Sequence, residues 1–206
     1  ISISSRARTC WSSMSRQTAT DTGCACGSRR RFLTRLIVCL PAATAMARLA
    51  RAADETLVER RLHLVNTHTG EELDARYFAG GAYSPEQLGA MDWLLRDYRT
   101  SEVLAMDSRL FDLLHELAQA AGREPRYEII SGYRSPSTNA MLAATTDGVS
   151  SHSLHMEGRA IDVRMLGLPS MALRDLALAR KAGGVGYYPV SDFVHLDTGR
   201  VRSWSA

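Results

Sequence analysis

Cysteine is missing from the greater part of this 206-residue chain. Four cysteines lie at or before Cys39, and none follows. A disulfide framework and a thiolate zinc site are therefore excluded for residues 40–206. Any metal site in this part of the chain must use histidine and carboxylate ligands.

Residues 53–206 also lack an excess of positive charge. Residues 1–52 carry nine arginines and one acidic residue, whereas residues 53–206 carry a net charge of −5. Lys181 is the only lysine. Because nucleic-acid binding depends on clustered lysine and arginine, residues 53–206 are not expected to bind nucleic acid.

No apolar run near the N-terminal end is long enough to span a bilayer, which takes roughly 20 residues. The apolar run of residues 36–43 follows three arginines, 29–31, and precedes the A-x-A sequence 50–52. This order predicts a twin-arginine signal peptide over residues 28–52, cleaved before Ala53. We therefore expect a periplasmic or cell-envelope location, without a stable membrane span after signal cleavage.

Two further segments flank this signal. Residues 1–27 match no pattern. We expect them to be unstructured, or to be sequence upstream of the true translation start that was wrongly included in the chain. Residues 53–206 are expected to form one domain. Their pattern has no repeat and no regular β–α alternation, which predicts an α+β fold with helices packed on a mostly antiparallel sheet.

The expected elements follow from periodicity and from turn residues. A polar–apolar alternation predicts a hairpin of residues 60–66 and 71–78. Ser84-Pro85 with Gln87 predicts the start of a helix whose apolar stripe runs to Tyr98. Further helices are expected at 108–121, from Pro136 and from Ser170 to Lys181, and further strands at 127–131, from Ala160, at 185–188, 193–197 and 201–204.

Three residues suit a metal site. Side chains alternate along a strand, so Asp162 and His195 each lie on the face opposite their apolar neighbours. If the two strands are adjacent, Asp162 and His195 point together, and His155 can fold over from its loop. Gly158 permits the tight backbone that this loop needs.

Two imidazoles and one carboxylate leave zinc a position for water, as in catalytic sites. Such water is acidic enough to act as a nucleophile at neutral pH, and a base must take its proton. Asp192 is the favoured candidate base and Asp197 the other, although Asp197 could instead orient a ligand histidine. Arg134 is the candidate catalytic clamp for an oxyanion or a carboxylate.

The motifs 131–136 (S-G-Y-R-S-P), 153–162 (S-x-H-x-x-G-x-A-x-D), 184–189 (G-V-G-Y-Y-P) and 193–197 (F-V-H-x-D) resemble YcbK-like exported proteins. Those proteins belong to the zinc D-alanyl-D-alanine peptidase superfamily, which shares its fold with the Hedgehog signalling domain. The resemblance implies one zinc ion on His155, Asp162 and His195.

The same resemblance implies hydrolysis of peptide bonds in peptidoglycan stem peptides or their cross-links, with Arg134 positioning the substrate. Many relatives have H-x-H or E-x-x-H before the last ligand, whereas this chain has Phe193 and Asp192. His152 and Tyr187 are candidate substrate-binding residues.

The leading expectation is thus a periplasmic zinc peptidase, either a murein endopeptidase or a carboxypeptidase, whose partners are peptidoglycan peptides. The alternative is a catalytically weak, zinc-containing protein that binds or scaffolds murein. A serine hydrolase is a poorer interpretation, because the serines at 150, 151 and 153 lack a G-x-S-x-G elbow.

Overall fold

The computed structural model describes residues 58–145 and 150–206. The predicted signal peptide and its cleavage site lie outside these residues. The elements, in chain order, are β1 (Arg60–Asn66), β2 (Glu72–Ala79), β3 (Ala82–Tyr83), α2 (Pro85–Leu94), α3 (Ser108–Ala120), β4 (Arg126–Ser131), α4 (Pro136–Thr145), the 3₁₀ helix η1 (Leu154–Glu157), β5 (Ala160–Met165), α5 (Ser170–Arg180), β6 (Gly184–Tyr188), β7 (Phe193–Asp197) and β8 (Arg202–Ser205).

The strands form one mixed sheet in the order β3-β2-β1-β4-β5-β7-β6-β8. Only the pairs β1–β4 and β6–β8 are parallel; every other neighbouring pair is antiparallel. The predicted α+β class with a mostly antiparallel sheet is therefore confirmed. In the part of the chain that the structure describes, no helix is long and apolar enough to cross a membrane.

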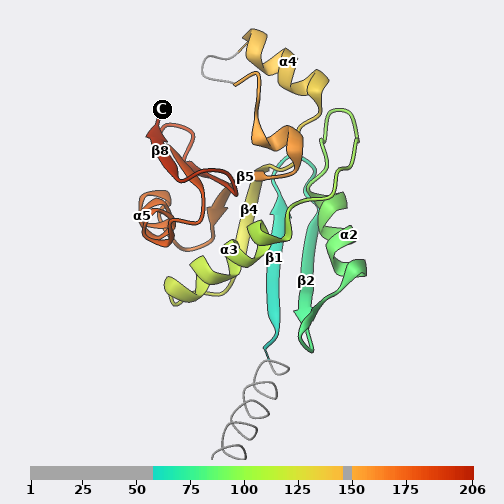
Figure 1. The fold of residues 1–206 in the computed structure, drawn as a ribbon, viewed down its shortest axis with the longest axis vertical. Coiled ribbons are helices and arrows are strands. Elements are labelled where there is room, and N and C mark those ends of the chain that lie inside the picture. Colours follow the sequence, from blue (N-terminus) through green and yellow to red (C-terminus); the bar gives the residue numbers. More distant parts are fainter. Residues whose placement is uncertain (1–57, 146–149) are drawn as a thin grey trace, which may run out of the picture. The chain divides into compact units, whose positions relative to one another are not determined.

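One face of the sheet packs against α2, α3 and α5, as Figure 1 shows. Strand side chains on this face join helix side chains in a single buried cluster. The predicted inward residues of β5 and β7 are all fully buried in it: Ile161, Val163, Val194 and Leu196. Burial of such side chains stabilises the fold by about 1.5–3 kcal/mol each, and it leaves the opposite side of β5 and β7 for polar residues.

Local sequence explains where most elements begin and end. The Ser84 hydroxyl accepts a hydrogen bond from the Gln87 backbone N–H at 3.3 Å and caps α2, as predicted. That helix ends at Leu94, so Tyr98 belongs to the following loop, not to the helix stripe that the sequence predicts. There its ring stacks on His68 with centroids 4.0 Å apart.

Helix α4 differs from α2, α3 and α5 because its two buried residues, Thr138 and Asn139, are both polar. Figure 1 shows α4 standing beyond the end of the sheet at which β5 and η1 meet. The Ser135 hydroxyl accepts from the Thr138 backbone N–H at 3.2 Å and fixes the start of this helix.

Candidate metal centre

Two of the three predicted ligands face each other across adjacent strands. Strand β5 lies between β4 and β7, and its Asp162 pairs directly with His195 of β7. Their strand neighbours point into the apolar core on the other face, which fixes both polar side chains on the face opposite α2, α3 and α5. The predicted adjacency of these two strands is thereby confirmed.

The third predicted ligand, His155, comes from η1. The Ser153 hydroxyl caps this short helix, and Gly158 ends it with φ of 66°. A Cβ at Gly158 would lie 2.5 Å from the carbonyl oxygen of Ala105, so only glycine fits the turn. The turn brings the His155 ring over β5 and β7, although His155 precedes His195 by forty residues in the sequence.

Three ligand atoms converge in this arrangement. His155 Nε2 lies 3.2 Å from His195 Nδ1 and 3.3 Å from Asp162 Oδ1. His195 Nδ1 lies 2.8 Å from the same Asp162 oxygen. Four donors placed tetrahedrally at zinc-ligand distances of about 2.0–2.1 Å are about 3.3 Å apart, so the spacing suits a metal ion of this kind.

The hydrogen bonds on the far side of each ring select the tautomer. His155 Nδ1 lies 2.8 Å from the Gly132 carbonyl oxygen, to which it must donate, so Nε2 carries a lone pair. His195 Nε2 lies 3.2 Å from Asp197 Oδ2, so in the neutral ring Nε2 donates to Asp197 and Nδ1 carries the lone pair. With both rings neutral, two lone pairs and a carboxylate oxygen point at one another, an arrangement that a cation between them stabilises.

The charges favour a cation at this place. Burial would lower the pKa of His195, but hydrogen bonds and charges from Asp162 and Asp197 outweigh burial and raise it to about 9. Without a metal the His195 ring therefore carries a proton, which a bound metal ion would replace. Burial would raise the pKa of Asp162, yet the two histidines hold it below its ordinary value. Burial dominates at His155 and lowers its pKa, which favours the neutral, metal-binding imidazole.

Arg134 lies beside this cluster on the loop after β4. Its backbone N–H donates to the His155 carbonyl oxygen at 3.2 Å, and its Nη2 lies 3.9 Å from Asp162 Oδ2. The loop itself is held by Asp97, which accepts hydrogen bonds from the backbone and the hydroxyl of Ser135 at 2.9 and 2.7 Å. The backbone of Arg134 is therefore held next to the predicted metal ligands.

The two candidate bases have different surroundings. Asp197 is fully buried: besides His195, it accepts from the backbone N–H groups of Gly184 and Gly199 and pairs with Arg202 at 2.7 Å. With both oxygens occupied, it is placed to orient His195.

Asp192 has an exposed side chain, a φ of 51° and a carboxylate 3.9 Å from Arg164. It precedes His195 by three residues, about 10 Å along an extended strand. The structure does not bring it into the ligand cluster, and its role as a base stays a prediction.

Aromatic side chains of β6 and β8 border the site. Strand pairing places Tyr187 beside Val194 on the helix-covered face, where the Arg174 guanidinium of α5 stacks on its ring at 4.8 Å. Substrate binding by Tyr187 stays a prediction. Its neighbour Tyr188 takes the other face and accepts a hydrogen bond from Trp204 Nε1 at 3.1 Å. The Trp204 ring lies 5.1 Å from the His195 ring.

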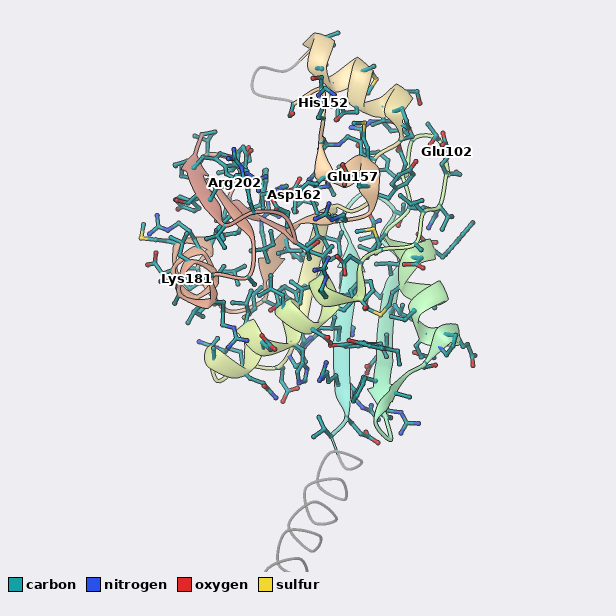
Figure 2. All side chains as sticks on the ribbon, viewed as in Figure 1. Glu102, His152, Glu157, Asp162, Lys181 and Arg202 are labelled. Carbon is teal, nitrogen blue, oxygen red and sulfur yellow. The ribbon has the colours of Figure 1, made fainter. Side chains whose placement is uncertain are left out.

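The remaining predicted substrate contact, His152, lies on the segment between α4 and η1, above Asp162 in Figure 2. Its side chain is exposed, and its Nδ1 lies 3.1 Å from the Ser151 hydroxyl. No metal-ligand contact of His152 occurs among the described residues, and substrate binding by His152 stays a prediction.

Sequence reasoning missed several residues that support the site. Nothing in the sequence relates Asp97 to Ser135, or Gly132 to His155, because each pair meets only in the folded chain. Glycine at 132 was a usable signal, since a Cβ there would overlap the Leu95 carbonyl oxygen. Glycine at 186 was another, because a Cβ would lie 2.6 Å from the Trp204 ring.

An α+β sheet that presents a His–Asp–His ligand set on its open face defines a class, the zinc D-alanyl-D-alanine peptidase superfamily. A family profile described as peptidoglycan L,D-endopeptidase MepK matches residues 54–204. The chain belongs to this family.

Two relatives illustrate the similarity. The peptidoglycan L,D-endopeptidase MepK of Escherichia coli (strain K12) is 43% identical over 145 residues, which cover 70% of this chain and 80% of that protein. The probable peptidoglycan L,D-endopeptidase MepK of Haemophilus influenzae is 42% identical over 146 residues, 70% of this chain and 78% of the relative. No solved structure gives a significant match.

Proposed function

We propose that this protein is a zinc-dependent peptidase that hydrolyses L,D peptide bonds in peptidoglycan. The observation that carries the proposal is the convergence of His155 Nε2, Asp162 Oδ1 and His195 Nδ1, three buried atoms of metal-ligand type. Membership of the MepK family supports peptidoglycan as the substrate and the L,D bond as the bond that is cut.

His155, Asp162 and His195 would hold one zinc ion, because two imidazoles and one carboxylate leave a catalytic zinc an open position. Bound zinc supplies Lewis acidity, which activates water and polarises a peptide carbonyl. Asp197 keeps His195 in the tautomer and orientation that binding needs. Arg134, next to Asp162, would position the substrate beside the metal ligands.

Proton transfer needs a further group. Asp197 is unsuited to this task, because both of its oxygens already accept hydrogen bonds in a buried site. Asp192 remains our candidate base, and it would have to approach the metal by a movement of the turn before β7. An Asp192→Asn variant tests the assignment through the acidic limb of the pH–rate profile, which should disappear if Asp192 is the base.

The cell wall lies outside the cytoplasm, so this function requires export. The twin-arginine pattern of residues 28–52 is our proposed route to the periplasm, with cleavage before Ala53. Sequencing the N-terminus of the exported protein tests this route, and a mature protein that retains residue 40 would contradict it.

The function is tested by digesting purified peptidoglycan with the zinc-loaded protein and identifying the products by mass spectrometry. We expect new termini at L,D bonds, loss of peptide release in His155→Ala, and normal peptide release in His115→Ala, whose histidine is half-buried on α3 and is not one of the predicted metal ligands. Activity that survives in His155→Ala would contradict a metal mechanism. A folded protein that binds zinc but releases no peptides from peptidoglycan would favour a murein-binding role instead.

A further inference from the structure

A second arginine accompanies Arg134 near the proposed zinc site. Arg99 lies in the loop between α2 and α3, and it lines a small cavity together with Gly132 and Arg134. The same Asp97 fixes both arginines: one of its oxygens accepts from the Arg99 backbone N–H at 3.0 Å, and the other holds Ser135, the residue after Arg134.

The Arg99 side chain is also positioned before any ligand arrives. Its guanidinium lies 4.2 Å from the centre of the Tyr98 ring, and this ring stacks on His68. Stacking on aromatic rings limits the rotamers of an arginine without occupying its hydrogen-bond donors. Arg99 is exposed, so its N–H groups are open to a ligand from solution.

Neither guanidinium has a close anionic partner among the described residues. For Arg99 no carboxylate lies within 4.0 Å, and for Arg134 the nearest is Asp162 at 3.9 Å. The hydrogen bonds from Arg134 to Asn139 and Ser131 are long, at 3.4 and 3.5 Å. Two neighbouring cations without an anion between them favour the binding of one.

We propose that Arg99 and Arg134 together bind a carboxylate of the peptide substrate close to the scissile bond. The proposal rests on the proposed function, because it concerns the same site. In an L,D bond the amide nitrogen is attached to a D stereocentre. The carboxylate on this stereocentre is free when the stereocentre is at the C-terminus of a peptide or lies in a side chain. This carboxylate lies two bonds from the scissile nitrogen, and planar guanidinium groups bind it through paired hydrogen bonds.

The test uses two peptides with the same L,D bond, one with a free carboxylate on the D residue and one with a carboxamide in its place. We expect the zinc-loaded wild type to favour the carboxylate peptide by about tenfold or more in kcat/KM, as charge-assisted hydrogen bonds imply. Arg99→Gln should bring this preference close to one, mainly through KM, and Arg99→Lys should keep part of it. Arg123→Gln, an exposed arginine at the turn before β4, is the matched control and should keep the full preference.

Calorimetric binding of both peptides to the metal-free proteins gives a second readout that needs no cleavage. Absence of cleavage by the wild type would contradict the proposed function alone. Equal binding of the two peptides by the wild type, or an unchanged preference in a folded Arg99→Gln protein, would overturn the carboxylate site.

Discussion

Replacing Asp197 with asparagine tests how the fold prepares His195 for a metal. The new side chain keeps one oxygen for the backbone N–H groups of Gly184 and Gly199, which lie 2.9 and 2.8 Å from Asp197 Oδ1. Its amide nitrogen then replaces Oδ2, opposite His195 Nε2 and Arg202. Because an amide N–H₂ donates, it favours the His195 tautomer with a proton on Nδ1, the atom that should bind the metal.

The expected loss follows from this change of tautomer. Partners that orient a ligand histidine typically contribute about 10–100-fold to metal affinity, which corresponds to about 1.4–2.7 kcal/mol. The variant also loses the ion pair of the fully buried Asp197 with Arg202, so the melting temperature should fall. Zinc affinity must therefore be measured well below the melting temperature.

The assay is competition for zinc with a chromophoric chelator at neutral pH, on Asp197→Asn and on Asp192→Asn as the control. Both variants remove one negative charge from an end of β7, but only the first touches the His195 ring. We expect weaker binding by Asp197→Asn and affinity close to wild type for Asp192→Asn. Equal affinities for wild type and a folded Asp197→Asn would refute the reasoning.

Three further predictions concern stability. Gly186→Ala should lower the free energy of unfolding by about 1–3 kcal/mol through overpacking, because its Cβ would lie 2.6 Å from the Trp204 ring. Thermal unfolding measures this loss. Gly158→Ala should cost about 1–3 kcal/mol in backbone strain, and weaken zinc binding measured with the same chelator, since its φ is 66°. Burial would raise the pKa of Asp97, but hydrogen bonds lower it to about 2. This pKa shift contributes up to about 2 kcal/mol to the free energy of unfolding above pH 4, and the contribution is lost as the pH falls towards 2. The free energies of unfolding of wild type and Asp97→Asn, measured in urea, should therefore converge as the pH falls.

Much of the fold follows from local sequence. Alternation in β1, β5 and β7 predicts strands because each has one apolar face, and Ser84 marks the start of α2 because its hydroxyl can satisfy a free N–H. The limits of α2 were less predictable. Apolar spacing continues to Tyr98, but the chain leaves the helix after Leu94 and places this ring against His68.

The ligand set could be predicted because strand alternation and one glycine were enough to bring His155, Asp162 and His195 together. The residues that surround them depend on contacts between distant segments. Asp97 supports the Arg134 loop from 38 residues away, a separation without any local signal. The face that Tyr187 takes depended on strand register, since a shift of one residue moves a side chain to the other face.

The central claim is that three atoms, His155 Nε2, Asp162 Oδ1 and His195 Nδ1, bind one zinc ion. Anomalous diffraction from crystals of the zinc-loaded protein, recorded on both sides of the zinc edge, tests it most directly. The account predicts a single peak about 2.0–2.2 Å from each of these atoms. A peak elsewhere, coordination through the opposite nitrogen of either ring, or no peak in a protein that cleaves peptidoglycan would contradict it.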